Sequence, residues 1–134
     1  MPTIAVVPIV LKDVLLKLGA TNEYQKHVSG VELIPSASTV NWKGLTPDSI
    51  FTDVTTATWT CNLSFAQDWA TTDSLSKYLF ANEGTAVVAT FQPISGGASF
   101  AATLLITPGS IGGQVDSVAV STVTLGVRGR PVLT

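Results

Sequence analysis

Apolar and polar residues alternate with a period of two along several segments of the chain. The clearest segment is 58–65, in which hydroxyl and amide side chains alternate with Trp59, Cys61, Leu63 and Phe65. Weaker versions of the pattern cover residues 14–18, 27–34, 87–92 and 99–106. A period of two places alternate side chains on opposite faces of a strand, and the many Val and Thr residues favour extended backbone. The pattern predicts a mainly β protein, and its length fits one domain, residues 1–134.

The last predicted strand contains a change of parity. Val118 and Val120 share one parity, whereas the apolar residues of segment 123–127 share the other. A shift of one residue moves side chains to the opposite face of a sheet. We therefore expect a β-bulge near Ser121 and Thr122, or a strand that is buried on both faces at different points.

One segment has helical spacing. Leu75, Tyr78 and Leu79 are three and four residues apart, so they share a helix face. Residues that suit helix ends flank them: Thr72 or Ser74 as N-cap, Asp73 in the first turn and Gly84 after the last turn. The spacing predicts one helix at about residues 73–82, lying on the flank of a sheet. The expected core is Trp59, Leu63, Phe65, Leu79, Phe91, Phe100 and Leu104.

A long segment between two predicted strands has little periodicity. Between Pro35 and Thr58 the only strand signal is the short stretch Val40 to Lys43, and Gly44 and Pro47 follow it. Loops of this length are uncommon in compact domains and usually have a function. We expect a long loop at about residues 35–58 that makes contacts with other chains.

The composition favours an assembly over a free monomer. Charged side chains make up 12% of the chain and hydrophobic ones 46%, whereas a typical domain has about 25% charged residues. Such a surface favours burial against other chains, although a monomer covered by Ser and Thr hydroxyls is the alternative. Lys and Arg are scattered and the net charge is −2. Proteins that grip nucleic acid cluster these cations against phosphates, so specific binding of nucleic acid is not expected.

Few residues suggest catalysis or ligand binding. His27 is the one histidine, and the sequence places no acid or nucleophile beside it. Cys61, the one cysteine, has the apolar parity of its strand, which predicts a buried and unreactive thiol. The acids around the helix lack the spacing of a calcium loop. The apolar run from Ile4 to Leu11 is too short to span a bilayer. We expect no enzyme, no catalytic residues, no cofactor, no metal and no membrane contact.

The order of several short blocks resembles that of a known family. The blocks are Val40–Pro47, Trp59–Phe65, Gln67–Trp69, Leu75–Asn82 with Glu83 and Gly84, Val87–Pro93, Phe100–Ile106, Ile111–Gly113 and Gly126–Pro131. In this order, and across Lys12 to Pro131, the sequence resembles the major tail tube proteins of long-tailed (siphovirus-type) bacteriophages. The resemblance implies a tail-tube-like β-sandwich of two sheets with one flanking helix.

The resemblance also implies how the protein works. Such proteins close into hexameric rings whose inner sheets join into a continuous barrel, and the rings stack through a long loop and the chain termini. The candidate residues for the inter-ring loop are Gly44, Leu45, Thr46, Pro47 and Asp48. The implied partners are further copies of the chain and the tape measure, terminator and distal tail proteins. Double-stranded DNA would pass through without specific binding. The implied location is the virion tail, after assembly in the host cytoplasm.

The lumen of such a tube should be lined by uncharged or acidic side chains, because a ring of Lys or Arg would hold DNA. Two strand faces fit, and the sequence does not choose between them. The candidates are Thr58, Thr60 and Asn62 on one strand and Thr90 and Gln92 on another. Two other functions stay open: another virion assembly protein, such as a head decoration or tail-completion subunit, and a carbohydrate-binding sandwich that uses Trp42 or Trp69.

Overall fold

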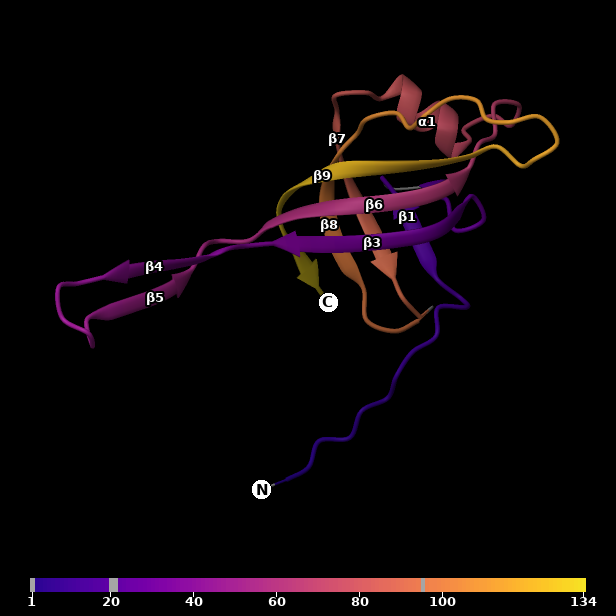
Figure 1. Cartoon of the computed structure of the whole chain (residues 1–134). Coiled ribbons are helices and arrows are strands. Elements are labelled where there is room, and N and C mark those ends of the chain that lie inside the picture. The colour runs from indigo at the N-terminus through magenta and orange to yellow at the C-terminus, as the bar shows by residue number, and fades with distance from the viewer. Residues whose placement is uncertain (1, 20–21, 95) are drawn as a thin grey trace.

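A computed structural model describes residues 2–19, 22–94 and 96–134. It contains one short helix and a series of antiparallel strands (Figure 1). The elements are β1 (Leu15–Leu18), β2 (Asn22–Glu23), β3 (Val28–Ser36), β4 (Thr39–Lys43), β5 (Ile50–Val54), β6 (Thr58–Ala66), α1 (Leu75–Ala81), β7 (Ala86–Gln92), β8 (Phe100–Leu105) and β9 (Val120–Leu133). The expectation of a mainly β protein with one flanking helix is confirmed.

The strands form two sheets of unequal size. The large sheet has seven strands in the order β2-β1-β7-β8-β9-β6-β3, and the small one is the pair β4-β5. The large sheet curls around a core to which most of its strands contribute (Figure 1). On β6, the alternating Cys61, Leu63 and Phe65 are all buried, as the period of two predicts. Full burial of a side chain such as Leu63 contributes about 1.5–3 kcal/mol.

The predicted core is only partly confirmed. Leu63, Phe65, Leu79 and Leu104 are buried. Trp59, Phe91 and Phe100 are half-buried instead. These three residues lie toward one end of the curled sheet, where the sheet leaves a space open (described below). The parity of each strand therefore predicts which face is apolar, but it does not tell where along the strand the core ends.

The helix is shorter than the predicted segment 73–82. It covers Leu75–Ala81, and Ser74 is its N-cap, with the Ser74 Oγ accepting the Lys77 N–H at 3.4 Å. Asp73 has a φ of 61°, a left-handed conformation that cannot continue a helix. Both Leu75 and Leu79 are completely buried, so the stripe read from the sequence is the face that packs against the core.

The bulge expected near Ser121 and Thr122 is not present. The pairing of β6 with β9 runs without interruption from Trp59↔Val127 to Ala66↔Val120. Ser121 is buried and points inward, as Val123 and Leu125 do. Because this core position holds a polar residue, the pattern of apolar residues in the sequence does not show that the parity of β9 stays the same. The register of β9 shifts instead against β8, between Ala101 and Thr103.

The segment expected as a long loop, about 35–58, contains a β-hairpin. Strands β4 and β5 pair in register from Thr39↔Val54 to Lys43↔Ile50. They form an arm, residues 39–54, that projects away from the large sheet (Figure 1). Every residue of both strands is exposed. The arm therefore has no half-buried face, and a half-buried face is what produces a strand period in a sequence.

Candidate assembly surfaces

The arm presents large apolar side chains to solvent. Trp42 and Phe51 are opposite each other in the register and are 64% and 58% exposed. On the other side of the hairpin, the Thr52 hydroxyl donates to Asn41 Oδ1 at 2.8 Å. An isolated two-stranded hairpin is marginally stable in water. An arm with an exposed aromatic pair is therefore expected to be stabilised by contact with another surface.

The candidate inter-ring residues form the tip of this arm, between the end of β4 and the start of β5. Leu45 is fully exposed there. The turn is closed by backbone hydrogen bonds from Gly44 N–H to the Ser49 carbonyl (2.6 Å) and from Ser49 N–H to the Thr46 carbonyl (3.1 Å). A Cβ at Gly44 would lie 2.7 Å from the Ser49 Cβ, so the turn requires glycine at this position. The tip is thus an ordered turn that carries one exposed Leu.

Thr58, Thr60 and Asn62 face away from the core on β6. Thr60 lies between Ile34 on β3 and Gly126 on β9, and the neighbours of Asn62 are polar. Asn62 pairs with Glu32 on β3 and Thr124 on β9, and the Thr124 hydroxyl donates to Asn62 Oδ1 at 2.7 Å. No Lys or Arg occurs in β3, in β6 or in residues 120–126 of β9. The nearest cation by register is Arg128, opposite Thr103 on β8. We call this surface the hydroxyl face.

The second candidate pair, Thr90 and Gln92 on β7, also faces away from the core but in different surroundings. Thr90 pairs with Lys17 on β1 and with Ala101 on β8. In the sheet order, β8 and β9 separate β7 from β6, so the two sets of candidates do not form one site. Lys17 pairs in turn with Glu23 on β2. The face around Thr90 thus contains a cation beside an acid, whereas the one around Asn62 contains an acid and reaches its nearest cation at Arg128.

The side chains that could take part in catalysis or bind a metal lie apart from one another or are unreactive. Burial raises the pKa of the Cys61 thiol to about 11, so it stays protonated. His27 packs edge-on against Tyr24, with ring centroids 5.6 Å apart. No cluster of His, Cys, Asp and Glu able to hold a metal ion occurs in the described part of the chain. Within residues 2–19, 22–94 and 96–134, no helix is long and apolar enough to cross a membrane.

The tryptophans proposed for carbohydrate binding do not form one platform. Trp42 is on the arm, whereas Trp69 follows the opposite end of β6. Trp69 is 41% exposed, packs edge-on against Phe80 and donates its indole N–H to Gln67 Oε1 at 3.3 Å. Because the two indoles belong to different ends of the molecule, they cannot stack on the same sugar.

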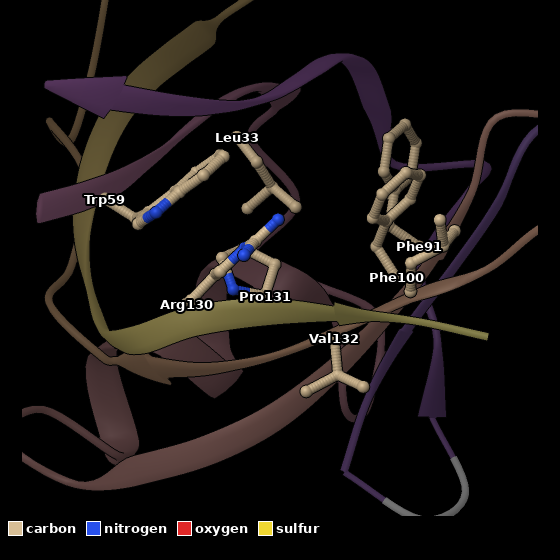
Figure 2. A pocket seen from close by; sticks show the side chains of 8 residues that line it. Leu33, Trp59, Phe91, Phe100, Arg130, Pro131 and Val132 are labelled. Carbon is tan, nitrogen blue, oxygen red and sulfur yellow. The ribbon is translucent and has the colours of Figure 1, made fainter. Parts of the chain in front are cut away.

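Sequence reasoning missed a cavity at the end of the curled sheet from which the arm projects. It has a volume of about 560 Å³ and is lined by Leu33, Trp59, Phe91, Phe100, Arg130, Pro131, Val132 and Leu133. Figure 2 shows Leu33 and Trp59 on one side of the space and Phe91 and Phe100 on the other. Arg130 is the only charged side chain in this lining. The cavity is built by strands far apart in the sequence, and no local motif signals it.

The chain was compared with known protein families, curated proteins and solved structures. No protein-family model matches the chain, and no curated protein matches its sequence. Solved structures do match. The chain has a tail-tube-like fold. It is similar to a chain in the tail of an empty gene transfer agent (GTA) particle, solved by helical refinement with C6 symmetry, at a TM-score of 0.67 and 16% identity, covering 91% of this chain and 96% of that one.

Two further solved structures are similar to the chain. A chain in the virion of a native GTA particle matches with a TM-score of 0.65 and 14% identity, over 91% of this chain and 95% of that one. A chain in the sheath/tube terminator of an extracellular contractile injection system, PVC, in its extended state, matches at 0.67 and 14%, over 96% and 97%. These structures are parts of a tail, a virion and an injection system, and at this level of identity they show the fold of the chain.

Proposed function

We propose that this protein is the subunit of a tail tube. It closes into hexameric rings that stack into a hollow conduit for DNA ejection into a host cell. The observation that carries the proposal is the fold match over nearly the whole chain to a helical tail with C6 symmetry. The low content of charged residues, 12%, supports it, because a subunit surrounded by other copies needs little charged surface.

In the proposed ring, the hydroxyl face lines the lumen. It combines Thr60 and Asn62 with the acid Glu32, and it lacks cations over residues 28–36, 58–66 and 120–126. A sixfold ring repeats every side chain six times, so even one Lys would create a belt of positive charge that retains DNA. Thr90 and Gln92 are disfavoured for the lumen, because Lys17 stands beside Thr90. DNA then passes without specific binding.

The arm joins one ring to the next. It projects from one end of the large sheet (Figure 1), and its Trp42, Phe51 and Leu45 are exposed. In a stack of equivalent rings, an element that projects beyond one end of the subunit reaches the following ring. The exposed apolar side chains then become buried there, which stabilises both the hairpin and the stack.

The same proposal sets the location and the other partners. The protein belongs to the virion tail, is assembled in the host cytoplasm, and meets the tape measure inside the tube. It meets the distal tail and terminator proteins at the two ends. A tail-completion subunit is the second candidate, because one of the matching structures is a sheath/tube terminator.

Electron microscopy of the purified protein tests the proposal. We expect tubes with sixfold symmetry in cross-section and no retention of DNA in a gel-shift assay at physiological salt. Single rings that never stack would favour the tail-completion subunit. Monomers at all concentrations, or tight binding of DNA, would contradict the tube function.

A further inference from the structure

The connection between β8 and β9 presents large apolar side chains to solvent. It comprises residues 107–119, and we call it the β8–β9 loop. Ile111, Val115 and Val118 are 63%, 89% and 77% exposed, and Asp116 is the only charged residue of the loop. A connection of this length without regular structure is uncommon in a compact domain and usually has a function. Exposed apolar side chains gathered on one loop indicate a contact with another surface.

Hydrogen bonds hold the β8–β9 loop in one shape. The Gln67 side chain pairs with the backbone of Gly112: its Nε2 donates to the Gly112 carbonyl at 2.8 Å, and its Oε1 accepts the Gly112 N–H at 2.9 Å. At the tip of the loop, the Ser117 hydroxyl donates to the Gln114 carbonyl at 3.0 Å. Asp116 has a φ of 67°, a left-handed conformation that Asp and Asn adopt more readily than other residues with a Cβ. A loop that is already ordered loses little conformational freedom when it binds.

The β8–β9 loop and the cavity belong to opposite ends of β6. Trp59, which lines the cavity, pairs with Val127 at one end of the strand. At the other end Ala66 pairs with Val120, the residue that follows the loop. Figure 1 shows the loop, in orange to yellow, at the end of the large sheet away from the arm. When rings stack in one direction, the arm end of each subunit faces the opposite end of a subunit in the following ring. Each cavity then faces the end that carries the β8–β9 loop.

The β8–β9 loop and the cavity are complementary in polarity, charge and size. Arg130 is the only charged residue in the cavity lining (Figure 2), and the loop carries one charge of opposite sign at Asp116. An Arg side chain can bind a carboxylate through two parallel hydrogen bonds. The cavity volume of about 560 Å³ lies within the range of roughly 300–1,000 Å³ of pockets that bury a whole ligand. The tip of the loop therefore has room to enter.

We propose that the cavity of each subunit receives the tip of the β8–β9 loop from a copy in the following ring, with Asp116 paired to Arg130. This proposal rests on the stacked rings proposed above, and it adds a second contact between rings to that of the arm. Val115 and Val118 then leave water against an apolar lining whose aromatic rings are half-buried in the subunit. The arm reaches past the end of the subunit, whereas the loop closes the space at the base of the arm.

Cross-linking of the full-length protein tests the contact. Val115→Cys in the loop is combined with Val132→Cys in the cavity lining, and assembled protein is treated with a short bis-maleimide. Val118→Cys in place of Val115→Cys covers a second position on the loop. Cys61 is buried, so the wild-type protein should not react. Because each subunit is joined to one copy in the ring before it and one in the ring after it, we expect a ladder of covalent species that continues beyond six subunits.

The control pair combines Val132→Cys with Glu83→Cys. Glu83 is exposed and precedes Gly84, whose N–H donates to the Ile106 carbonyl at 2.8 Å. It therefore lies at the same end of the molecule as the β8–β9 loop but outside the loop. We expect no ladder from this pair.

Each other outcome overturns the proposal in a recognisable way. A ladder that ends at six subunits would place the contact within a ring. An equal ladder from the control pair would mean that the loop is not seated in the cavity. Tubes visible by electron microscopy without cross-links from either loop position would refute the contact and leave the proposed function standing. An absence of rings would refute both.

Charge variants test the pairing of Asp116 with Arg130 without altering the fold. Both residues are exposed in the subunit, so the circular dichroism spectrum of the monomer should not change, and Asn keeps the left-handed conformation at position 116. Asp116→Asn and Arg130→Gln should each raise the concentration at half-assembly of tubes by roughly tenfold or more, because every ring repeats the pair six times. Glu83→Gln removes the same charge as Asp116→Asn, and as the matched control it should leave this concentration unchanged.

The double variant Asp116→Asn with Arg130→Gln shows whether the two charges act on each other. Residues in contact give non-additive effects, whereas independent residues give additive ones. We expect the double variant to shift the concentration at half-assembly no further than the larger of the two single variants. Additive shifts would show that the two side chains do not pair. No shift from either single variant would show that neither charge lies in the contact between rings.

Discussion

Trp42 and Phe51 are directly opposite each other on the arm, and both are more than half exposed. An aromatic pair in this position contributes little to the subunit itself, because only one two-stranded hairpin supports it. Opposite residues in an antiparallel pair have neighbouring side chains, so the two aromatic side chains form one patch. The patch provides a way to test the arm separately from the fold.

Removal of this patch should shorten tubes without unfolding the subunit. For the double variant Trp42→Ala and Phe51→Ala, we expect the free energy of unfolding of the monomer to change by less than about 1 kcal/mol, as is typical of exposed positions. Tubes imaged by electron microscopy should become short or absent while rings persist. Asn41→Ala with Thr52→Ala, on the other side of the same hairpin, is the control. Tubes of normal length from the aromatic variant would contradict an inter-ring role.

Deletion of Gly44 to Asp53 tests the same role more severely. The deletion removes the tip and most of β5 but no residue of the large sheet, so the subunit should still fold. We expect rings and no long tubes. The melting temperature of the monomer shows whether the subunit still folds. Electron microscopy shows whether rings form and whether they stack into tubes. Loss of the fold would show that the arm stabilises the subunit, contrary to the exposure of its strands.

The helix stripe gives a prediction about stability. Leu79 is completely buried, whereas its neighbour Phe80 is 59% exposed. Leu79→Ala should lower the free energy of unfolding by roughly 2–5 kcal/mol, since it leaves a cavity in a packed core. Phe80→Ala is the matched control and should cost less than about 1 kcal/mol. Chemical denaturation of the monomer measures both. Equal effects would mean that α1 does not pack as described.

The elements that the sequence predicts correctly are those with one face buried in the subunit. Strand β6 was predicted residue by residue, because Cys61, Leu63 and Phe65 face a core and their neighbours do not. The helix was found for the same reason, from Leu75 and Leu79. A period becomes visible in a sequence when one face of an element is buried within the subunit.

The features that were missed lack such a face or depend on distant contacts. The arm has no buried face, so β4 gave only the short signal from Val40 to Lys43 and β5 gave none. Buried Ser121 concealed the parity of β9. The cavity depends on the pairing of Phe91 with Phe100 and of Phe100 with Leu133, which local patterns do not reveal. The sequence also left two lumen faces open, and the choice of the hydroxyl face is a proposal that rests on the pairing of Asn62 with Glu32 and of Thr90 with Lys17.

Acid should weaken the turn that leads into the helix. The hydrogen bond from the Thr71 side chain, together with those from the amides of Thr71 and Ala70, lowers the pKa of Asp68 from 3.8 to about 2. A lowered pKa in the folded state contributes stability above the unfolded value. That stability is lost as the pH falls from about 4 to about 2.

The matching variant is Asp68→Asn. We expect it to reduce the melting temperature at neutral pH and to flatten the fall in melting temperature between about pH 4 and pH 2. Asp13→Asn, an exposed acid outside the helix region, serves as control and should follow the wild-type curve. Parallel acid profiles for Asp68→Asn and the wild-type protein would show that the turn does not depend on this carboxylate.

The lumen assignment predicts opposite results for two similar substitutions. Thr60→Lys places a cation on the hydroxyl face, next to Gly126 and Ile34 in the register. In a hexamer it adds six positive charges to every layer of the lumen, and each cation that contacts a phosphate raises the affinity for DNA. We expect tubes that assemble but eject DNA slowly, with the delay relieved by added salt because salt screens these contacts. Thr60→Gln controls for side-chain size.

Thr90→Lys adds the same charge beside Lys17, outside the lumen in this arrangement, and should leave ejection unchanged. Ejection kinetics measured at two salt concentrations decide between the faces: slow ejection from Thr90→Lys with normal ejection from Thr60→Lys would assign the lumen to the face around β7.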